Sequence, residues 1–293
     1  MARWLEAILP RDWLLDERRA RMHRNASEIA KIRLLQDRRE PLLFADWEQV
    51  EFLHFRMPPE VLRPHIPPPF QLELWEDEAW LSIVALTMRR FRPGRRGSVA
   101  ALACGLKYQR FLNFRTYITA GAETGAYFLY GWLSRPWGLS WPSGMCGFPY
   151  AFADVAYEGM QDNGRLDSRV SALGGQAAFA FTISSSGREP KADQGKARQA
   201  PNEFLLERYS GFFVRRGQPH VFRTWHPPWL QVDARAEILD TTLISNKFPW
   251  FREARFAGAH YAQGFKDVWL SRLHRLDEAR PKPRRASAFF EMP

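Results

Sequence analysis

Hydrophobic and polar positions alternate with a period of two along much of the chain beyond Trp47, as in strands that bury one face. The strictest alternation covers residues 111–120. Its apolar face holds Leu112, Phe114 and Ile118, and its polar face holds Asn113, Arg115 and Tyr117. A short turn at 121–125 leads into an aromatic-rich segment, 126–133. The pattern predicts two consecutive strands in the middle of the chain.

Similar alternation, bounded by proline-rich or glycine-rich segments, predicts further strands. Residues 71–75 and 79–88 flank Glu76 and Asp77 and are candidates for a hairpin. The other predicted strands cover residues 51–55, 150–158, 168–173, 176–183, 210–215, 230–238, 259–265 and 266–273. About ten to twelve strands and few long helices favour a mainly β (α+β) fold, with one antiparallel sheet closed or folded on itself.

The apolar spacing becomes helical near the N-terminus, where Ile29, Ile32 and Leu35 continue a stripe among charged residues. We expect this helical segment to pack on the body of the protein or on a partner, with a basic amphipathic membrane anchor as the alternative. A short helix is also predicted at 202–209. The chain therefore divides into a helical N-terminal extension (1–40), a β-domain (41–278) and a basic tail (279–293).

Composition is that of a folded globular protein, because 45% of the 293 residues are hydrophobic and 25% are charged. No apolar run approaches the ~18 residues that cross a bilayer. The two cysteines, Cys104 and Cys146, exclude a disulfide scaffold and form no CxxC motif. The first nine residues lack the features of a secretory signal. These observations predict a cytoplasmic protein without a transmembrane segment.

Positive charge exceeds negative charge, with 42 Lys and Arg against 32 Asp and Glu, and seven of the 42 are lysines. Guanidinium groups suit carboxylate and phosphate, so an acidic small molecule, an anionic membrane or nucleic acid is a compatible partner. The arginines are scattered and no nucleic-acid-binding motif accompanies them, which makes nucleic acid an unlikely partner. Twelve Trp and 22 Phe suit a wide interior or a pocket for an organic ligand.

Common catalytic motifs are missing: there is no GxSxG, P-loop, GxGxxG or HExxH sequence, and no two histidines form an H-x-H pair. The sequence therefore predicts neither a metal nor a cofactor. It leaves open whether the protein is an enzyme and whether it forms a homo-oligomer.

Several short segments nevertheless occur in a characteristic order. They are FLHF (52–55), PEVLRPHIP (59–67), EAWLSIV (78–84), LNFRTY (112–117), GFPY (147–150), LERY (206–209) and HPPW (226–229). Together they resemble the YqjF-like family of uncharacterised bacterial proteins, which is related by fold to acetoacetate decarboxylase. The resemblance covers roughly residues 45–245. It implies an acetoacetate-decarboxylase-like antiparallel β-barrel or folded double sheet around a central cavity.

The same resemblance bears on the reaction. Acetoacetate decarboxylases form a Schiff base through a lysine whose pKa is lowered by an adjacent lysine, and this pair follows a Gly-x-Pro segment. Here Gly147-Phe148-Pro149 is followed by Tyr150 and Ala151. A phenol forms no imine, so the resemblance predicts that Schiff-base decarboxylation is absent. Lys107, Lys247 and Lys266 are the lysines near predicted strands, and we expect them on the surface.

A second departure concerns a carboxylic acid. The family commonly has a glutamate just before the Leu-Asn segment, and this chain has Phe111 there. An acid that would serve proton transfer is therefore missing.

Arg115 is the main candidate site residue, because a charge within an apolar strand is costly without a partner. It either binds an anionic ligand, with Asn113 and Tyr117 as hydrogen-bonding neighbours, or pairs with a buried acid or faces solvent. Tyr150 is a candidate ligand-binding or proton-donating group, and packing in the core is the alternative. His226, between Trp225 and two prolines, is a candidate general base, against a structural corner of stacked rings.

The sequence as a whole favours a protein that binds a small organic, possibly anionic, ligand in a barrel cavity without lysine Schiff-base chemistry. Arg115, Asn113, Tyr117 and Tyr150 are the predicted ligand-binding residues, and Tyr150 and His226 are the catalytic candidates. If the protein is an enzyme, a lyase, hydrolase or isomerase is expected. The alternative is an interaction protein whose basic helical arm attaches it to a partner, a membrane surface or nucleic acid.

Overall fold

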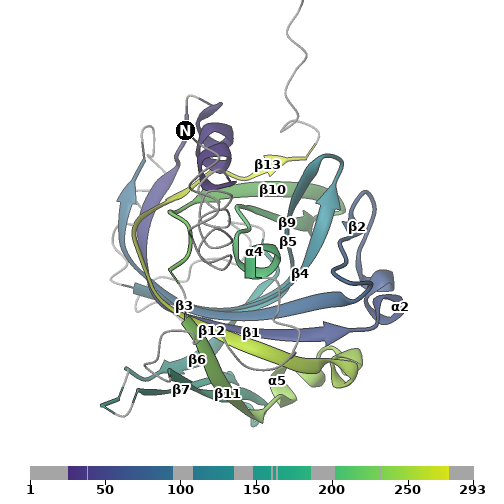
Figure 1. Cartoon of the computed structure of the whole chain (residues 1–293), viewed down its shortest axis with the longest axis vertical. Coiled ribbons are helices and arrows are strands. Elements are labelled where there is room, and N and C mark those ends of the chain that lie inside the picture. Colours follow the sequence, from purple (N-terminus) through teal and green to yellow (C-terminus); the bar gives the residue numbers. More distant parts are fainter. Residues whose placement is uncertain are drawn as a thin grey trace, which may run out of the picture.

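Thirteen strands form one sheet in the described part of the chain, shown by a computed structural model (Figure 1). The structure describes residues 26–37, 39–94, 108–134, 148–159, 161–162, 164–185, 202–230 and 232–276. The strands are β1 (Leu43–Met57), β2 (Gln71–Leu72), β3 (Ala79–Pro93), β4 (Tyr108–Ala120), β5 (Glu123–Ser134), β6 (Tyr150–Tyr157), β7 (Arg165–Ala172), β8 (Ala178–Ser185), β9 (Ser210–Arg215), β10 (Gln218–Trp225), β11 (Val232–Asp240), β12 (Arg255–Leu270) and β13 (His274–Arg275). The predicted mainly β fold is confirmed.

Short helices connect these strands. They are α2 (Pro59–Leu62), α4 (Asn202–Leu206), α5 (Thr242–Ser245) and the 3-10 turns η2 (Arg63–His65) and η4 (Pro249–Glu253). A further helix covers residues 26–35. Residues 1–25 and 277–293 lie outside the described residues, so most of the predicted arm and the whole basic tail do too.

Two strands fork, and the forks close the sheet into two rings. The first half of β5 pairs with β9 and its second half pairs with β6. Strand β12 likewise pairs with β11 through one half and with β10 through the other. The first ring runs β12-β1-β3-β4-β5-β9-β10, and the second runs β12-β1-β3-β4-β5-β6-β7-β8-β11. Five strands, β12, β1, β3, β4 and β5, therefore belong to both rings.

A shared strand lies between the two rings, which explains why β3 begins with nine consecutive buried residues. Trp80 and Val84 of β3 pack with Phe52 of β1 in the interior of the first ring. Leu81 and Ile83, which point the other way, pack in the second ring. A strand that is buried on both faces lacks the alternation of apolar and polar residues found in a half-exposed sheet. Sequence periodicity therefore underestimates the length of such strands.

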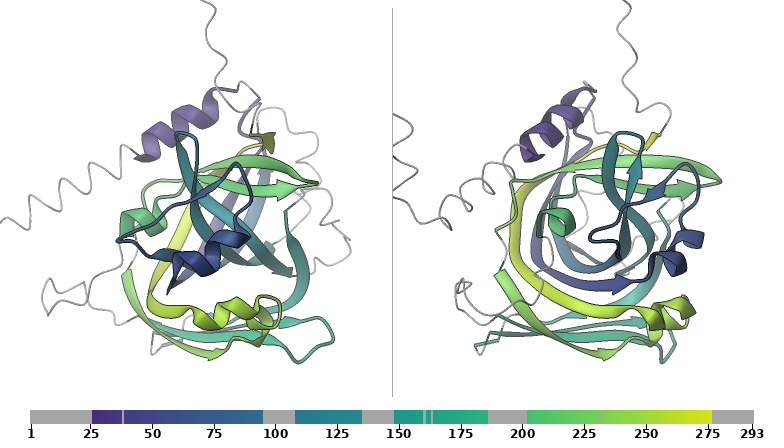
Figure 2. Two further views of the ribbon diagram at one scale, coloured as in Figure 1. Left: turned by 90° about the vertical axis from the view of Figure 1, so that its right-hand side faces the viewer. Right: turned by 45° about the vertical axis from the view of Figure 1, so that its right-hand side comes forward.

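Helix α4 lies inside the outline of the first ring in Figure 1 and in the right-hand view of Figure 2. Three side chains from outside the helix satisfy its C-terminal carbonyl groups, which have no partner within the helix. The Arg208 Nε donates to the oxygen of Phe204 at 2.5 Å, the Tyr117 hydroxyl to that of Leu205 at 3.0 Å, and the Trp229 indole to that of Leu206 at 3.0 Å. The helix is thereby fixed to the wall of the ring.

The helix over residues 26–35 packs on the outside of the first ring. Lys31 Nζ lies 4.4 Å from the ring centroid of Trp225 and 5.0 Å from that of Trp269. Ala30 and Leu34 are buried, whereas Ile29 and Ile32 are 50% and 63% exposed. The predicted apolar stripe was therefore wrong at Ile29 and Ile32: the packed face is set by the small Ala30 against the ring.

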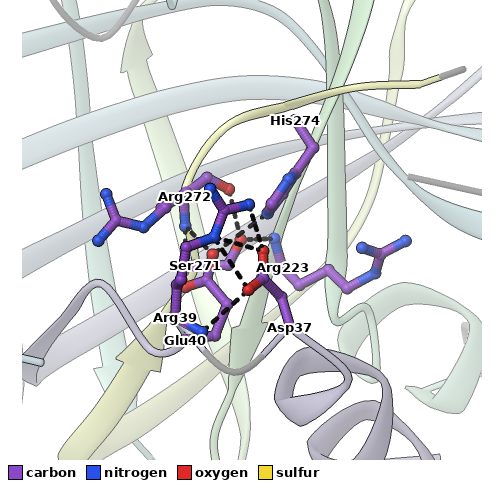
Figure 3. Close-up of polar contacts among 7 residues, drawn as sticks. All are labelled: Asp37, Arg39, Glu40, Arg223, Ser271, Arg272 and His274. Carbon is purple, nitrogen blue, oxygen red and sulfur yellow. Dashed lines mark hydrogen bonds and ion pairs between the residues drawn. The ribbon is translucent and has the colours of Figure 1, made fainter. Parts of the chain in front are cut away.

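A polar cluster joins the end of this helical segment to the chain after β12 (Figure 3). The buried Glu40 carboxylate accepts from the Arg272 backbone N–H at 3.0 and 3.1 Å and lies 3.2 Å from His274 Nε2. Asp37 forms an ion pair with Arg39 at 2.7 Å. Ser271 Oγ accepts from the Arg223 N–H at 2.8 Å and donates to the Arg272 oxygen at 2.7 Å. These contacts fix residues 37–40 to the edge of the first ring.

Three strand predictions need correction. Residues 71–88 form no hairpin, because β2 pairs with β4 and only Trp75 and Glu78 form a bridge across the turn. Leu230 is 87% exposed and precedes β11 rather than beginning it. Residues 259–265 and 266–273 belong largely to one strand, β12, which carries an irregularity in its pairing with β1 where two strands were predicted. Strand β10 was not predicted.

Glu51 is a buried acid on the second-ring face of β1. It is 1% exposed, and the Ser168 hydroxyl donates to its Oε2 at 2.8 Å. Burial raises the pKa of Glu51 to about 8, which one hydrogen bond opposes only in part. The side chain is thus a neutral carboxylic acid in the folded protein at pH 7.

Glu51→Gln is expected to stabilise the protein increasingly as pH rises. The folded pKa lies above the unfolded value, so wild-type stability is lost between about pH 4.5 and pH 8 as the unfolded carboxyl ionises. The glutamine variant avoids this loss, and its advantage over wild type reaches up to about 5 kcal/mol above pH 8 on the ordinary conversion of a pKa difference. Urea unfolding at pH 4.5, 6 and 8 measures the trend. Glu158→Gln, at an exposed position, is the control and is expected to change stability little; an equal effect at all three pH values for Glu51→Gln would contradict the assignment.

Candidate functional site

Polar side chains cross the shared strands on the face that lines the first ring. His54 of β1 pairs in register with Ser82 of β3, which pairs with Arg115 of β4. In the next row, Phe52 pairs with His260 of β12 on one side and with Val84 on the other. Residues directly opposite each other on neighbouring strands share a face, so the register alone brings these side chains together.

A chain of hydrogen bonds links four polar side chains on this face, those of His260, His54, Ser82 and Tyr117, to α4. His260 Nδ1 lies 3.0 Å from His54 Nε2, and His54 Nδ1 lies 2.7 Å from Ser82 Oγ. Ser82 Oγ in turn contacts the hydroxyl of Tyr117, which donates to the Leu205 carbonyl. All four side chains are buried.

The carbonyl at the end fixes the direction of the whole chain. Because Tyr117 uses its proton on the Leu205 oxygen, Ser82 must donate to Tyr117. Ser82 then has no proton left for His54, so His54 donates from Nδ1. Burial, with His260 and Arg115 nearby, lowers the pKa of His54 well below its usual value and keeps it neutral. Its Nε2 therefore accepts from His260 Nδ1.

Arg115 lies beside this chain without a carboxylate partner among the described residues. Protein surrounds its guanidinium, yet the side chain is only half-buried and keeps some accessible surface. Its Nε is buried without a hydrogen-bond partner within the described part of the chain, and the group lies 5.8 Å from the ring centroid of Phe52. Desolvation lowers the pKa of Arg115, against the effect of the Tyr117 and Tyr150 hydroxyls. Of the alternatives left open by the sequence, the pairing of Arg115 with a buried acid is not observed among the residues that the structure describes.

A second arginine near this face is compensated. Arg208 NH1 lies 2.8 Å from Glu73 Oε2, and its side chain is largely buried. The guanidinium also lies 5.2 Å from the ring centroid of Tyr117. The ion pair with Glu73 cancels the charge of Arg208, so Arg115 is the uncompensated one of the two.

Tyr150 and Asn113 meet across a glycine. The Tyr150 hydroxyl donates to Asn113 Oδ1 at 2.7 Å, which leaves the Asn113 amide N–H groups as donors on the same face. Gly131 of β5 is the register partner of both residues, and a Cβ there would overlap the Tyr150 ring. Phe148 stacks on the other side of the tyrosine, with centroids 5.4 Å apart. The phenol therefore reaches Asn113 because residue 131 has no side chain.

His226 has a structural position. It is 1% exposed and stacks on Phe265 with ring centroids 5.0 Å apart. Its Nδ1 lies 2.6 Å from the Pro227 oxygen, and its own carbonyl accepts from the Ser27 hydroxyl at 2.8 Å. Burial lowers the pKa of His226 to about 4. These contacts support the structural corner over the general base.

The structure thus brings together four sequence-predicted residues, Arg115, Asn113, Tyr117 and Tyr150. It places His226 in a packed corner, near enough for the charge of Arg115 to help lower its pKa. Sequence reasoning missed His54, Ser82 and His260. The available signal was His54 itself, a histidine inside the apolar FLHF strand, together with Ser82 among the apolar residues of β3.

Lysine is absent from this face among the described residues. Lys247 and Lys266 are exposed, and Lys247 Nζ lies 4.0 Å from the ring centroid of Tyr130. Lys31 belongs to the outer helix. The remaining lysines, including Lys107, lie outside the described residues.

Asp37, Glu40 and His274 have the composition of a metal site, and their ligand atoms lie within 4.8 Å of one another (Figure 3). Arg39 occupies both carboxylate oxygens of Asp37, however, and the Arg272 N–H occupies those of Glu40. Partners of this kind do not suit a cation, so we assign the cluster to the attachment of residues 37–40.

Comparison with known proteins places this architecture in a family. A family model described as DUF2071, an uncharacterized conserved protein, matches residues 45–266, more than half of the chain. The chain belongs to this family. The chain is also similar to the uncharacterized protein YqjF of Bacillus subtilis (strain 168). The two are 25% identical over 197 residues, which are 67% of this chain and 78% of that protein. The predicted resemblance to YqjF-like proteins is confirmed.

Solved structures similar to this DUF2071 protein share the acetoacetate decarboxylase fold. Acetoacetate decarboxylase from Legionella pneumophila is 12% identical with a TM-score of 0.54, covering 80% of this chain and 86% of that one. The enduracididine biosynthesis enzyme MppR is 13% identical with a TM-score of 0.55, covering 80% and 88%. An acetoacetate decarboxylase-like enzyme from Sphingomonas wittichii RW1 is 12% identical with a TM-score of 0.51, covering 80% and 94%. At these identities the likeness shows the fold.

Within the described residues, no helix of the DUF2071 protein has the length and apolar character needed to cross a bilayer.

Gly131→Ala is expected to displace Tyr150 from Asn113, because the added methyl group occupies the volume of the phenol ring. Forced repacking of this kind costs about 1–3 kcal/mol of stability. Thermal unfolding measures the loss, and a crystal structure of the variant would show the lost hydrogen bond. Gly159→Ala, just beyond the end of β6, is the matched control, since a Cβ there meets no atom within 4 Å. Wild-type stability with Tyr150 in place would contradict this role of Gly131.

Proposed function

We propose that this protein binds a small organic anion, such as a carboxylate, on the interior face of the first ring. The observation that carries the proposal is the uncompensated guanidinium of Arg115. A buried cation is costly unless an anion neutralises it, and neither an ion pair nor a hydrogen bond to its Nε comes from the described part of the protein. A bound carboxylate would supply both, with the planar two-oxygen geometry that guanidinium prefers.

Neighbouring groups support an organic rather than an inorganic ligand. The Asn113 amide, whose oxygen accepts from Tyr150, offers N–H donors beside Arg115, and Phe52 and Trp80 contribute apolar surface on the same ring face. Trp80 Nε1 is a further buried donor without an acceptor among the described residues. Ligand pockets combine apolar walls with a few polar groups in this way. Structures of MppR, which has this fold, are described as complexes with pyruvate and with HEPES, both organic anions.

The proposed chemistry excludes a Schiff base. Tyr150 occupies the position after Gly-Phe-Pro where the resemblance to decarboxylases expects a lysine, and its hydroxyl is engaged with Asn113. The described face offers no primary amine in its place. The protein therefore recognises its ligand through charge and hydrogen bonds.

Arg115→Gln is expected to separate binding from folding. Because the guanidinium is buried and uncompensated, the ligand-free variant should unfold at the same temperature as wild type or higher. Wild type should be stabilised by small carboxylates such as pyruvate or butyrate, by about 2.7 kcal/mol at a concentration 100 times Kd, and the variant should not. Differential scanning calorimetry measures both quantities. Arg235→Gln, at an exposed position of β11, is the control and should keep the ligand response; retention of that response in Arg115→Gln would refute the site.

Reduction with sodium borohydride in the presence of pyruvate is expected to leave the mass of the protein unchanged. An imine would be trapped as a stable amine adduct, which intact-mass spectrometry detects. Peptide mapping would assign any adduct to one of the seven lysines. An adduct would overturn the exclusion of Schiff-base chemistry while leaving anion binding at Arg115 to be judged by calorimetry.

A further inference from the structure

Arg115 provides one positive charge on this face, and none of the groups around it supplies a second uncompensated positive charge. Arg208, whose charge also lowers the pKa of Arg115, is already paired with Glu73 at 2.8 Å. His54 and His226 are the histidines whose pKa Arg115 itself helps to lower. The remaining polar neighbours, Tyr117 and Tyr150, are phenols, which carry no positive charge in either protonation state.

His54 is prevented from supplying the second charge by the direction of its hydrogen bonds. Its Nδ1 proton goes to Ser82, whose own proton goes toward Tyr117 and the Leu205 carbonyl. Its Nε2 is thereby left as the acceptor of the His260 proton. A proton added at Nε2 would place two donors, His54 Nε2 and His260 Nδ1, 3.0 Å apart facing each other. The chain must therefore rearrange before this pair carries additional charge.

We propose that the site selects organic anions with a single negative charge and discriminates against dianions at neutral and alkaline pH. This inference rests on the proposed anion binding at Arg115. A monoanion neutralises Arg115 and leaves the interior without net charge. The second charge of a dianion would be buried beside neutral groups, which is unfavourable in a region of low dielectric constant.

We expect a dianion to bind only when the protein takes up a proton at the same time. The titratable and charged groups that face His54 are His260 from β12 and Arg115 and Tyr117 from β4, with the neutral Ser82 from β3 between them. A dianion opposes the repulsion between Arg115 and a protonated His54, and thus favours a proton on His54. Dianion affinity should consequently rise as pH falls, with about one proton taken up per ligand bound, whereas monoanion affinity should stay constant.

Isothermal titration calorimetry with matched ligands tests this selectivity on the wild-type protein. Ethanesulfonate and 1,2-ethanedisulfonate keep charges of one and two at every pH used, so any proton uptake belongs to the protein. Butyrate and succinate form the carboxylate pair at pH 8. We expect the monoanion to bind at least about tenfold more tightly at pH 8. The difference should narrow at pH 6, and titration in two buffers of different ionisation heat gives the number of protons taken up.

Glu73→Gln supplies a gain-of-function test outside the proposed ligand contacts. The substitution leaves Arg208 charged and uncompensated near Arg115, while glutamine still offers an oxygen to Arg208. Dianion affinity at pH 8 should rise about tenfold, with a smaller change for the monoanion. Glu237→Gln, which makes the same charge change at an exposed position of β11, is the control and should leave both affinities unchanged.

The outcomes separate the two proposals. Equal binding of monoanion and dianion at pH 8, or a dianion affinity independent of pH, overturns the single-charge selectivity and leaves anion binding intact. Failure of every anion to bind overturns the proposed function and the selectivity with it. If wild type prefers the monoanion and Glu73→Gln reduces this preference, the result supports the inference that one uncompensated positive charge on this face sets the selectivity.

Discussion

The five strands shared by the two rings bury much of both faces along their central residues, and this constraint governs the rest of the structure. A polar side chain on a strand such as β1 or β3 points into one ring or the other, where water is not available as a partner. Each polar group must therefore find a complement in the protein or lose stability. Glu51 meets the constraint on the second-ring side by holding its proton, and His54 meets it on the first-ring side by entering a directed chain of hydrogen bonds.

Arg115 is the group that meets this constraint least well. A guanidinium cannot release its proton at physiological pH, as Glu51 retains one, and the described residues offer it no carboxylate. Buried charged groups without a partner in the protein tend to mark functional sites, because the compensation comes from something outside the chain. The uncompensated charge of Arg115 thus favours the binding of an anion but lowers the stability of the ligand-free fold.

Sequence periodicity predicted the strand content, and it placed Asn113, Arg115 and Tyr117 on one face of β4 because that strand alternates strictly. The ordered motifs supplied the family. Periodicity could not predict that β5 and β12 fork, since a fork is a pairing between distant segments that leaves no local pattern. For the same reason His260, which lies more than two hundred residues from His54, could not be joined to it, and the exposed Ile29 and Ile32 misled a prediction based on spacing alone.

The forks in β5 and β12 also determine how the protein unfolds. Strands β6, β7, β8 and β11 are joined to the remainder through β5 and β12, and both of these strands also complete the first ring. Neither ring is a modular unit that could be excised, because cutting one out removes walls from the other. Opening of either compartment should then be coupled to disruption of a common scaffold, so the innermost amides of β1 and β3 belong to a single cooperative unit despite the two compartments they separate.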